Sequence, residues 1–126
     1  MLMSKEIKII INGTIRSKKN SKRIFATGKS KKVLPSKSYV SWEQDAWRQM
    51  MAAGFNTLGV LSFPIEVTAM IYYKGPRPDL SGALESIGDC LQKIIWADDA
   101  QIESWDGSRL IHDKDNPRTE ITVKIL

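Results

Sequence analysis

Histidine and cysteine are nearly absent from this sequence. The chain has one histidine, His112, and one cysteine, Cys90. A structural zinc site needs several such ligands, so a zinc-stabilised fold is effectively excluded. Cys90 stands in an apolar helical pattern, which favours core packing over catalysis. We interpret His112 as a surface or sheet-edge residue rather than a general base.

Long apolar runs are also absent. No stretch approaches the roughly 18 apolar residues that cross a bilayer, and residues 1–8 do not have the pattern of a signal peptide. We therefore expect a cytoplasmic protein that does not enter a membrane. With 126 residues and 42% hydrophobic content, the chain fits one domain, residues 1–126, around a single core.

Charge is divided unevenly along the chain. Residues 1–45 carry 11 Lys/Arg and 3 Asp/Glu, a net charge of +8, whereas residues 46–126 carry 8 and 11, a net charge of −3. A basic front indicates a polyanion partner, because a cation near a phosphate releases bound counterions. An acidic back can hold a metal cation, and a nuclease needs both properties.

The hydrophobic pattern predicts an α+β fold with a mixed β-sheet and two helices packed on it. Alternating or β-rich runs predict strands over residues 6–12, 65–73, 101–111 (interrupted at 106–107) and 119–125. Helical spacing predicts helices over residues 38–55 and 80–94, the second with a buried stripe of Leu80, Leu84, Ile87, Leu91 and Ile94. The four tryptophans are interpreted as core or dimer-interface residues.

The segment 16–37 is the basic part of the chain, with nine Lys/Arg and no acid. It fits a β-hairpin or a plain flexible loop equally well. Phosphate contacts of such a segment position DNA without reading its sequence. Phe25 could stack on an opened base or could cover the edge of the core. The residues predicted to bind DNA are Arg16, Lys18, Lys19, Asn20, Lys22, Arg23, Phe25, Lys29, Lys31, Lys32 and Lys37.

Carboxylates gather around the second predicted helix. Glu85 and Asp89 follow Ser81 at helical spacing in a polar row, Asp79 precedes the helix, and Asp98 and Asp99 follow it. Adjacent strand and helix ends can bring such side chains together. An all-oxygen set suits Mg²⁺ or Mn²⁺ better than zinc, and a bound Mg²⁺ supports phosphodiester hydrolysis.

Each of these carboxylates also has a structural interpretation. Asp79 could cap the helix, since Asp is a favoured N-cap residue. Glu85 and Asp89 could form a solvated face, and Asp98–Asp99 could be a turn. The pattern alone leaves both interpretations open.

The same segment resembles the RusA family of Holliday-junction resolvases. The residues that carry the resemblance are Arg77-Pro-Asp79-Leu80, a short helix with Asp89, and a closing Trp96-Ala-Asp98-Asp99-Ala-Gln101-Ile102. Ser17 to Ser21 and Pro35-Ser36-Lys37 with Tyr39 and Trp42 are similar to the front of phage and prophage members. The resemblance spans about residues 9–123 and implies an α+β homodimer that cuts four-way DNA junctions with Mg²⁺, which Mn²⁺ can replace.

By this resemblance Asp79 and Asp99 match the catalytic aspartates, and Asp89 and Asp98 match residues that ligate metal or support the site. Two positions depart from the family pattern: Ser81 replaces an aspartate and Glu85 replaces a lysine. The carboxylate count is kept, with Glu85 as a further catalytic and metal-binding candidate, but a cation that could stabilise the transition state is lost.

The leading hypothesis is therefore a Mg²⁺-dependent, structure-selective endodeoxyribonuclease in DNA recombination and repair. A second hypothesis is a catalytically inactive protein that binds branched DNA, which the changes at Ser81 and Glu85 favour. A third is a nuclease that acts on RNA or on flaps.

Overall fold

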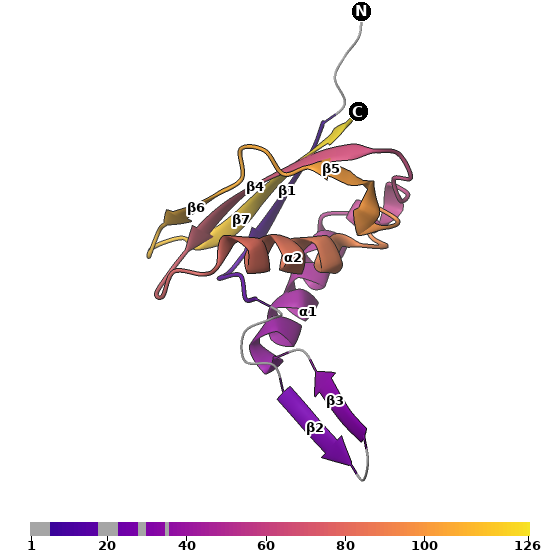
Figure 1. Ribbon diagram of the computed structural model, residues 1–126. Helices are drawn as coiled ribbons and strands as arrows, with labels where there is room; N and C mark the ends of the chain where they lie inside the picture. The colour runs from indigo at the N-terminus through magenta and orange to yellow at the C-terminus, as the bar shows by residue number, and fades with distance from the viewer. Residues whose placement is uncertain (1–5, 18–22, 28–29, 35) are drawn as a thin grey trace, which may run out of the picture.

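The computed structural model describes residues 6–17, 23–27, 30–34 and 36–126. Within them, five strands form one mixed sheet in the order β1-β7-β4-β5, with β6 also paired to β4 (Figure 1). β1 and β4 are antiparallel to the central β7, whereas β5 and β6 are parallel to β4. The strands are β1 (Glu6–Asn12), β4 (Ile65–Tyr73), β5 (Ile102–Ser104), β6 (Arg109–His112) and β7 (Arg118–Ile125).

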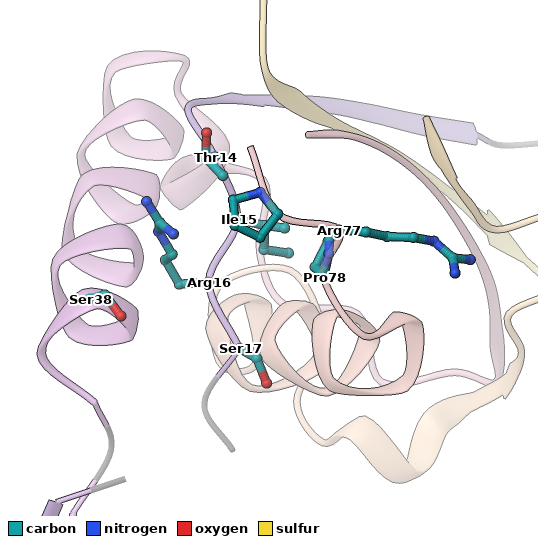
Figure 2. A pocket seen from close by; sticks show the side chains of 8 residues that line it. Thr14, Ile15, Arg16, Ser17, Ser38, Arg77 and Pro78 are labelled. Atoms are coloured by element: carbon teal, nitrogen blue, oxygen red, sulfur yellow. The ribbon is translucent and has the colours of Figure 1, made fainter. Parts of the chain in front are cut away.

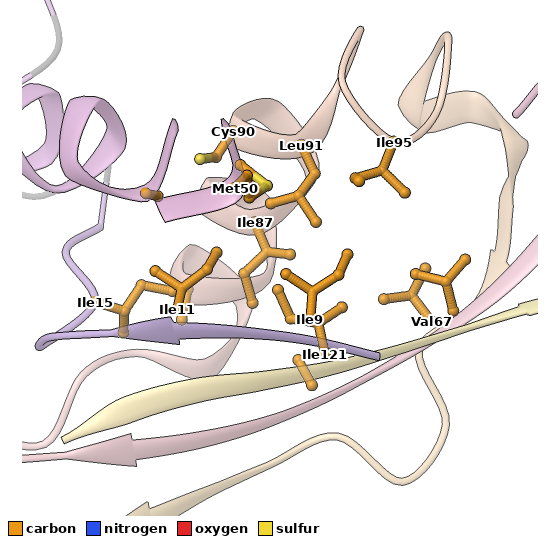
Figure 3. Close-up of a cluster of buried hydrophobic side chains, with 14 of the residues drawn as sticks. Ile9, Ile11, Ile15, Met50, Val67, Ile87, Cys90, Leu91, Ile95 and Ile121 are labelled. Atoms are coloured by element: carbon orange, nitrogen blue, oxygen red, sulfur yellow. The ribbon is translucent and has the colours of Figure 1, made fainter. Parts of the chain in front are cut away.

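Two helices, α1 (Lys37–Ala52) and α2 (Leu80–Leu91), cover one face of this sheet (Figures 1 and 3). β4 contributes every second side chain to the core, as the pleat of a strand requires. The predicted α+β fold is thereby confirmed. The buried cluster includes Ile9, Ile11, Ala46, Met50, Val67, Ile87, Cys90, Leu91, Ile121 and Val123.

Both helices end earlier than predicted. Gly54 follows α1 with a φ of +85°, and a short 3-10 turn (Phe55–Thr57) takes the last predicted residues. α2 ends at Leu91 because Gln92 is extended and Lys93 has a φ of +71°. Of the predicted stripe, Ile87 and Leu91 are fully buried, but Leu80, Leu84 and Ile94 are only half-buried. The buried face is instead centred on Ala83, Ile87 and Cys90.

The four tryptophans divide between core and surface. Trp42 and Trp96 are buried and Trp105 packs against the core, whereas Trp47 is 38% exposed. The Trp47 indole nonetheless has a fixed position, because its Nε1 donates to the Cys90 carbonyl at 2.9 Å.

The basic segment contains a β-hairpin, so the hairpin alternative is the one observed. β2 (Arg23–Thr27) pairs antiparallel with β3 (Ser30–Leu34), from Arg23↔Leu34 to Thr27↔Ser30. The hairpin extends from the region where α1 begins (Figure 1). It is a separate two-stranded sheet and does not extend the main one.

A β-α-β crossover sets the position of the acidic segment. α2 connects β4 to the parallel β5, so its two ends lie toward opposite ends of β4. The start of β5 pairs with the start of β4, at Ile65↔Ile102. The residues before α2 follow the end of β4 instead.

Candidate active site

The N-terminal end of α2 holds Asp79. Gly75, with a φ of +79°, and two prolines separate it from the end of β4. Its Oδ2 accepts hydrogen bonds from the Gly82 backbone N–H (3.0 Å) and the Ser81 hydroxyl (2.9 Å). Asp79 is therefore the N-cap of α2, as the structural interpretation predicted. The same contacts orient an exposed carboxylate at the positive end of a helix dipole.

A polar row follows Asp79 along α2. Ser81 and Glu85 are exposed and Asp89 is half-buried, next to the fully buried Ala83 and Ile87. This is the arrangement that the helical spacing predicts. Ser81 stands where the family pattern has an aspartate, and here its hydroxyl helps to hold Asp79 in place.

The segment after α2 fixes the closing pair of aspartates. A short 3-10 helix, η2 (Asp99–Gln101), is capped by Asp98, whose Oδ1 accepts from the Ala100 N–H at 3.0 Å. Gln101 completes a capping box, because its Oε1 accepts from the Asp98 N–H at 2.8 Å. Its Nε2 also donates to the carbonyls of Leu61 and Phe63. Gln101 thus ties the acidic turn to the segment before β4.

Asp98 and Asp99 behave as one acidic unit. The Asp98 side chain, hydrogen-bonded to Asp99, raises the pKa of Asp99, and slight burial and the charges of Asp98 and Asp89 raise it further. The pKa of Asp98 is lowered by the Ala100 N–H and then by the hydrogen bond with Asp99. Of the two carboxyls, Asp99 therefore takes up a proton first as the pH falls. A dication bound here would offset the repulsion between the two charges.

The structure brings some of the predicted residues together and separates others. Asp99 lies beside the C-terminal half of α2: a Cβ added to Gly88 would be 3.8 Å from the Asp99 Cβ. The charge of Asp89, on the same half of α2, raises the pKa of Asp99. Asp79 is nine helical residues from Gly88, a rise of about 14 Å. Asp79 and Asp99 therefore lie toward opposite ends of α2. Among the described residues, no three His, Cys, Asp or Glu side chains form a group able to hold a metal ion.

The start of the basic segment packs directly on the acidic helix. Ser86 Oγ donates to the Arg16 carbonyl at 2.8 Å, and the buried Ser17 lies against Gly82. Figure 2 shows Ser17 beside the first turns of α2 and Arg16 on the side toward α1. The local sequence pattern does not predict this contact, which joins residues far apart in the chain.

The other predicted DNA-binding residues have varied positions. Arg16 and Lys37 are exposed. The backbones of Arg23, Phe25, Lys31 and Lys32 lie in the hairpin, where Phe25 pairs with Lys32. Five predicted residues lie outside the described part of the chain: Lys18, Lys19, Asn20, Lys22 and Lys29.

The two residues considered unsuited to catalysis lie inside the core, for Cys90, and on the exposed end of a strand, for His112. Cys90 is buried, and burial, followed by the charges of Glu43 and Asp89, raises the pKa of its thiol. His112 is exposed at the end of β6. Its ring lies edge-on to the Tyr73 ring, with the two ring centroids 5.4 Å apart. Neither position supports a role as nucleophile or base.

Comparison with known protein families decides the relationship that the motifs indicated. The model of the family described as endodeoxyribonuclease RusA matches residues 12–124. The chain belongs to the RusA family. No curated protein matches it. The RusA match includes β1's last residue, the basic hairpin, both helices and the whole acidic segment.

Membership of the RusA family implies an endonuclease that binds and cuts DNA. The root of the basic hairpin, Arg16–Ser17, packs on α2, the helix that Asp79 caps. No helix among the described residues is long and apolar enough to span a membrane.

Proposed function

We propose that this protein is a Mg²⁺-dependent endodeoxyribonuclease that resolves four-way DNA junctions in recombination and repair. Asp79, Glu85, Asp89, Asp98 and Asp99 are its metal-binding candidates, and Asp79, Asp99 and Glu85 its catalytic ones. The observation that carries the proposal is the placement of exposed carboxylates along α2 and η2 beside the root of a basic hairpin, in a member of the RusA family.

The donor chemistry of this region fits Mg²⁺. Its ligands are carboxylate oxygens with no histidine or thiolate, and Mn²⁺ accepts the same set. Mg²⁺ sites use one or two carboxylates together with water and substrate phosphate oxygens. In this proposal Asp89 and Asp99 are the two carboxylates, and water and substrate phosphate oxygens complete the ligand set, since no three-ligand group is present among the described residues. When bound, the ion would polarise the scissile phosphate and favour ionisation of a water molecule.

The residues of the chain have three separate tasks in this proposal. Asp99 and Asp89 hold the cation, and Asp98 takes up hydrogen bonds that keep the turn in place. Asp79 accepts from Ser81 and Gly82, so its carboxylate is positioned before DNA arrives. The basic segment 16–37 holds phosphates on the flanking strands.

Junction resolution also leads us to propose a homodimer. A four-way junction has two symmetric strands to cut, and a two-fold dimer presents two equivalent acidic sites. Sedimentation of the protein with and without junction DNA would test this part of the proposal. A monomer that remains monomeric on the junction would contradict it.

The proposed chemistry is tested with charge-removing variants. Asp79→Asn and Asp99→Asn should each lower the junction cleavage rate by about 10²-fold or more, while junction binding in Ca²⁺ persists. Asp106→Asn is the matched control, because Asp106 is exposed in the turn between β5 and β6. Cleavage that survives both substitutions would overturn the assignment.

A second candidate function is binding of branched DNA without cleavage. Two observations favour it. Ser81 and Glu85 replace an aspartate and a lysine of the family pattern. In addition, Asp79 is separated by a rise of about 14 Å along α2 from the part of the helix beside which Asp99 lies. Tight junction binding that is indifferent to Mg²⁺, with no cut in Mg²⁺ or Mn²⁺, would establish it. Flap and RNA duplex substrates in the same assay separate the remaining nuclease activities.

A further inference from the structure

A groove lies between the segment 13–17, which follows β1, and α1, at the root of the basic hairpin. It consists of two adjoining hollows of about 240 and 400 Å³ that share Thr14, Arg16 and Ser38. The first extends to Pro78, next to Asp79, and the second extends along α1 to Arg48. The groove therefore connects the neighbourhood of the acidic helix to the chain segments that lead into and out of the hairpin.

The lining of the groove is rich in hydrogen-bond donors. The larger hollow is lined by two cations, Arg16 and Arg48, by the hydroxyl residues Ser38 and Ser41 of α1, and by a single carboxylate, that of Asp45. Arg48 pairs with Asp45 at 3.6 Å, but both side chains are more than half exposed, so this pair holds Arg48 weakly. Asp45 also accepts from Gln49 Nε2 at 3.0 Å. Such a surface favours an anion.

A buried donor in the same lining lacks an acceptor. Trp42 lines the larger hollow and is 6% exposed, and its Nε1–H has no hydrogen-bond partner within the described part of the chain. Buried N–H groups are nearly always paired, because an unpaired one costs free energy. A ligand oxygen that reaches Nε1 would supply the missing acceptor.

Arg77, which also lines the smaller hollow, points in a different direction from Arg16. Figure 2 shows the Arg77 side chain extending away from Arg16 and from α1. The two arginines therefore do not clamp one ligand between them. The two cations that line the same hollow are Arg16 and Arg48.

We propose that this groove is a binding site for a backbone phosphate of the DNA substrate, with Arg16 and Arg48 as its charges and Trp42 Nε1–H as a buried donor. The proposal rests on the proposed function, since it takes DNA as the ligand. It adds Trp42 and Arg48 to the DNA-binding residues. A strand that follows the hairpin toward Asp79 passes this groove, so the phosphate bound here fixes the register of that strand on α2.

Binding measurements in Ca²⁺ test the charged residues without cleavage. Arg16→Gln and Arg48→Gln should each weaken junction binding and reduce the slope of log K against log salt by about 0.9, the value for one lost phosphate contact. Arg109→Gln, an exposed arginine on β6, is the matched control and should leave the slope unchanged. Slopes equal to that of the unmodified protein in both groove variants would overturn the proposal.

Trp42→Phe tests the indole donor while keeping an aromatic ring in the core. We expect weaker junction binding at an unchanged salt slope, with thermal stability equal or higher because an unpaired N–H is removed. The Trp42 indole resonance, assigned from this variant, should shift on titration with junction DNA. Inorganic phosphate in the same titration separates binding of free phosphate from binding of the DNA backbone. Unaltered affinity in Trp42→Phe, with no shift of the resonance, would exclude the donor role.

These outcomes are independent of the proposed chemistry. A protein that binds junctions through the groove without cutting them would contradict the nuclease proposal and leave the groove intact. Normal cleavage with unaltered binding by the Arg16 and Arg48 variants would contradict only the groove.

Discussion

Ser17 and Gly82 lie in contact, with Ser17 Oγ only 2.6 Å from the position that a Cβ on Gly82 would occupy. This contact joins the basic segment to the acidic helix. Asp79 Oδ2 is 3.2 Å from the same position, so a side chain on residue 82 would disturb both the start of the basic segment and the cap of α2. Glycine at 82 is thus required by packing, although its φ is ordinary.

Gly82→Ala should therefore destabilise the protein by about 1 kcal/mol, because overpacking outweighs the usual gain of alanine in a helix. Urea unfolding measures the change. Ser17→Ala combined with Gly82→Ala should recover most of the loss. Gly88→Ala is the matched control, since the nearest atom to its added Cβ is 3.8 Å away. A Gly82→Ala protein as stable as the Gly88→Ala protein would show that the contact does not constrain the fold.

The Cys90 thiol should be unreactive in the folded protein. It is buried, and its pKa is raised first by burial and then by the charges of Glu43 and Asp89, so little thiolate forms. A thiol-reactive dye at mildly alkaline pH should label it only after denaturation. Rapid labelling of the native protein would place α2 away from the sheet and contradict the core described above.

Asp113 should make stability depend on pH. Its pKa is lowered chiefly by the Asn116 backbone N–H, with the Asp115 N–H and Arg118 adding to the effect. A folded-state pKa below the unfolded value contributes stability at neutral pH, and this contribution is lost as the pH falls through the folded pKa. The difference in unfolding free energy between the unmodified protein and Asp113→Asn should therefore shrink below about pH 4. A difference that does not change with pH would contradict this role.

Glu85 should increase the affinity for the metal ion. It is exposed one helical turn from Asp89, so its charge attracts a dication held by Asp89 and Asp99. Glu85→Gln should raise the Mg²⁺ concentration needed for half-maximal cleavage severalfold. Glu103→Gln, on the exposed side of β5, serves as the control. If both variants respond to Mg²⁺ as the unmodified protein does, Glu85 has no part in metal binding.

Much of the fold could be predicted because its elements have strong local periodicity. β1 and β4 begin and end at the predicted residues, and Ile9 and Ile11 are buried whereas Ile10 is 57% exposed. The helix ends were less predictable. Positive φ values at Gly54 and Lys93 end the helices early, and only the glycine is a residue that favours such a conformation.

The site was less predictable, because it depends on contacts between distant residues. The polar row of Glu85 and Asp89 follows from helical spacing alone. The bond from Ser86 to the Arg16 carbonyl joins residues 70 positions apart, and no local pattern indicates it. The distance between Asp79 and Asp99 likewise follows from the crossover, which places the two ends of α2 at different ends of β4.

The most direct test of the central claim is cleavage of a labelled four-way junction beside linear duplex of the same sequence, with and without Mg²⁺ or Mn²⁺. Our account predicts paired, metal-dependent nicks in the junction alone, abolished by Asp79→Asn or Asp99→Asn. Binding of the junction with no cut in either metal would contradict it and identify a protein that recognises branched DNA without cleaving it.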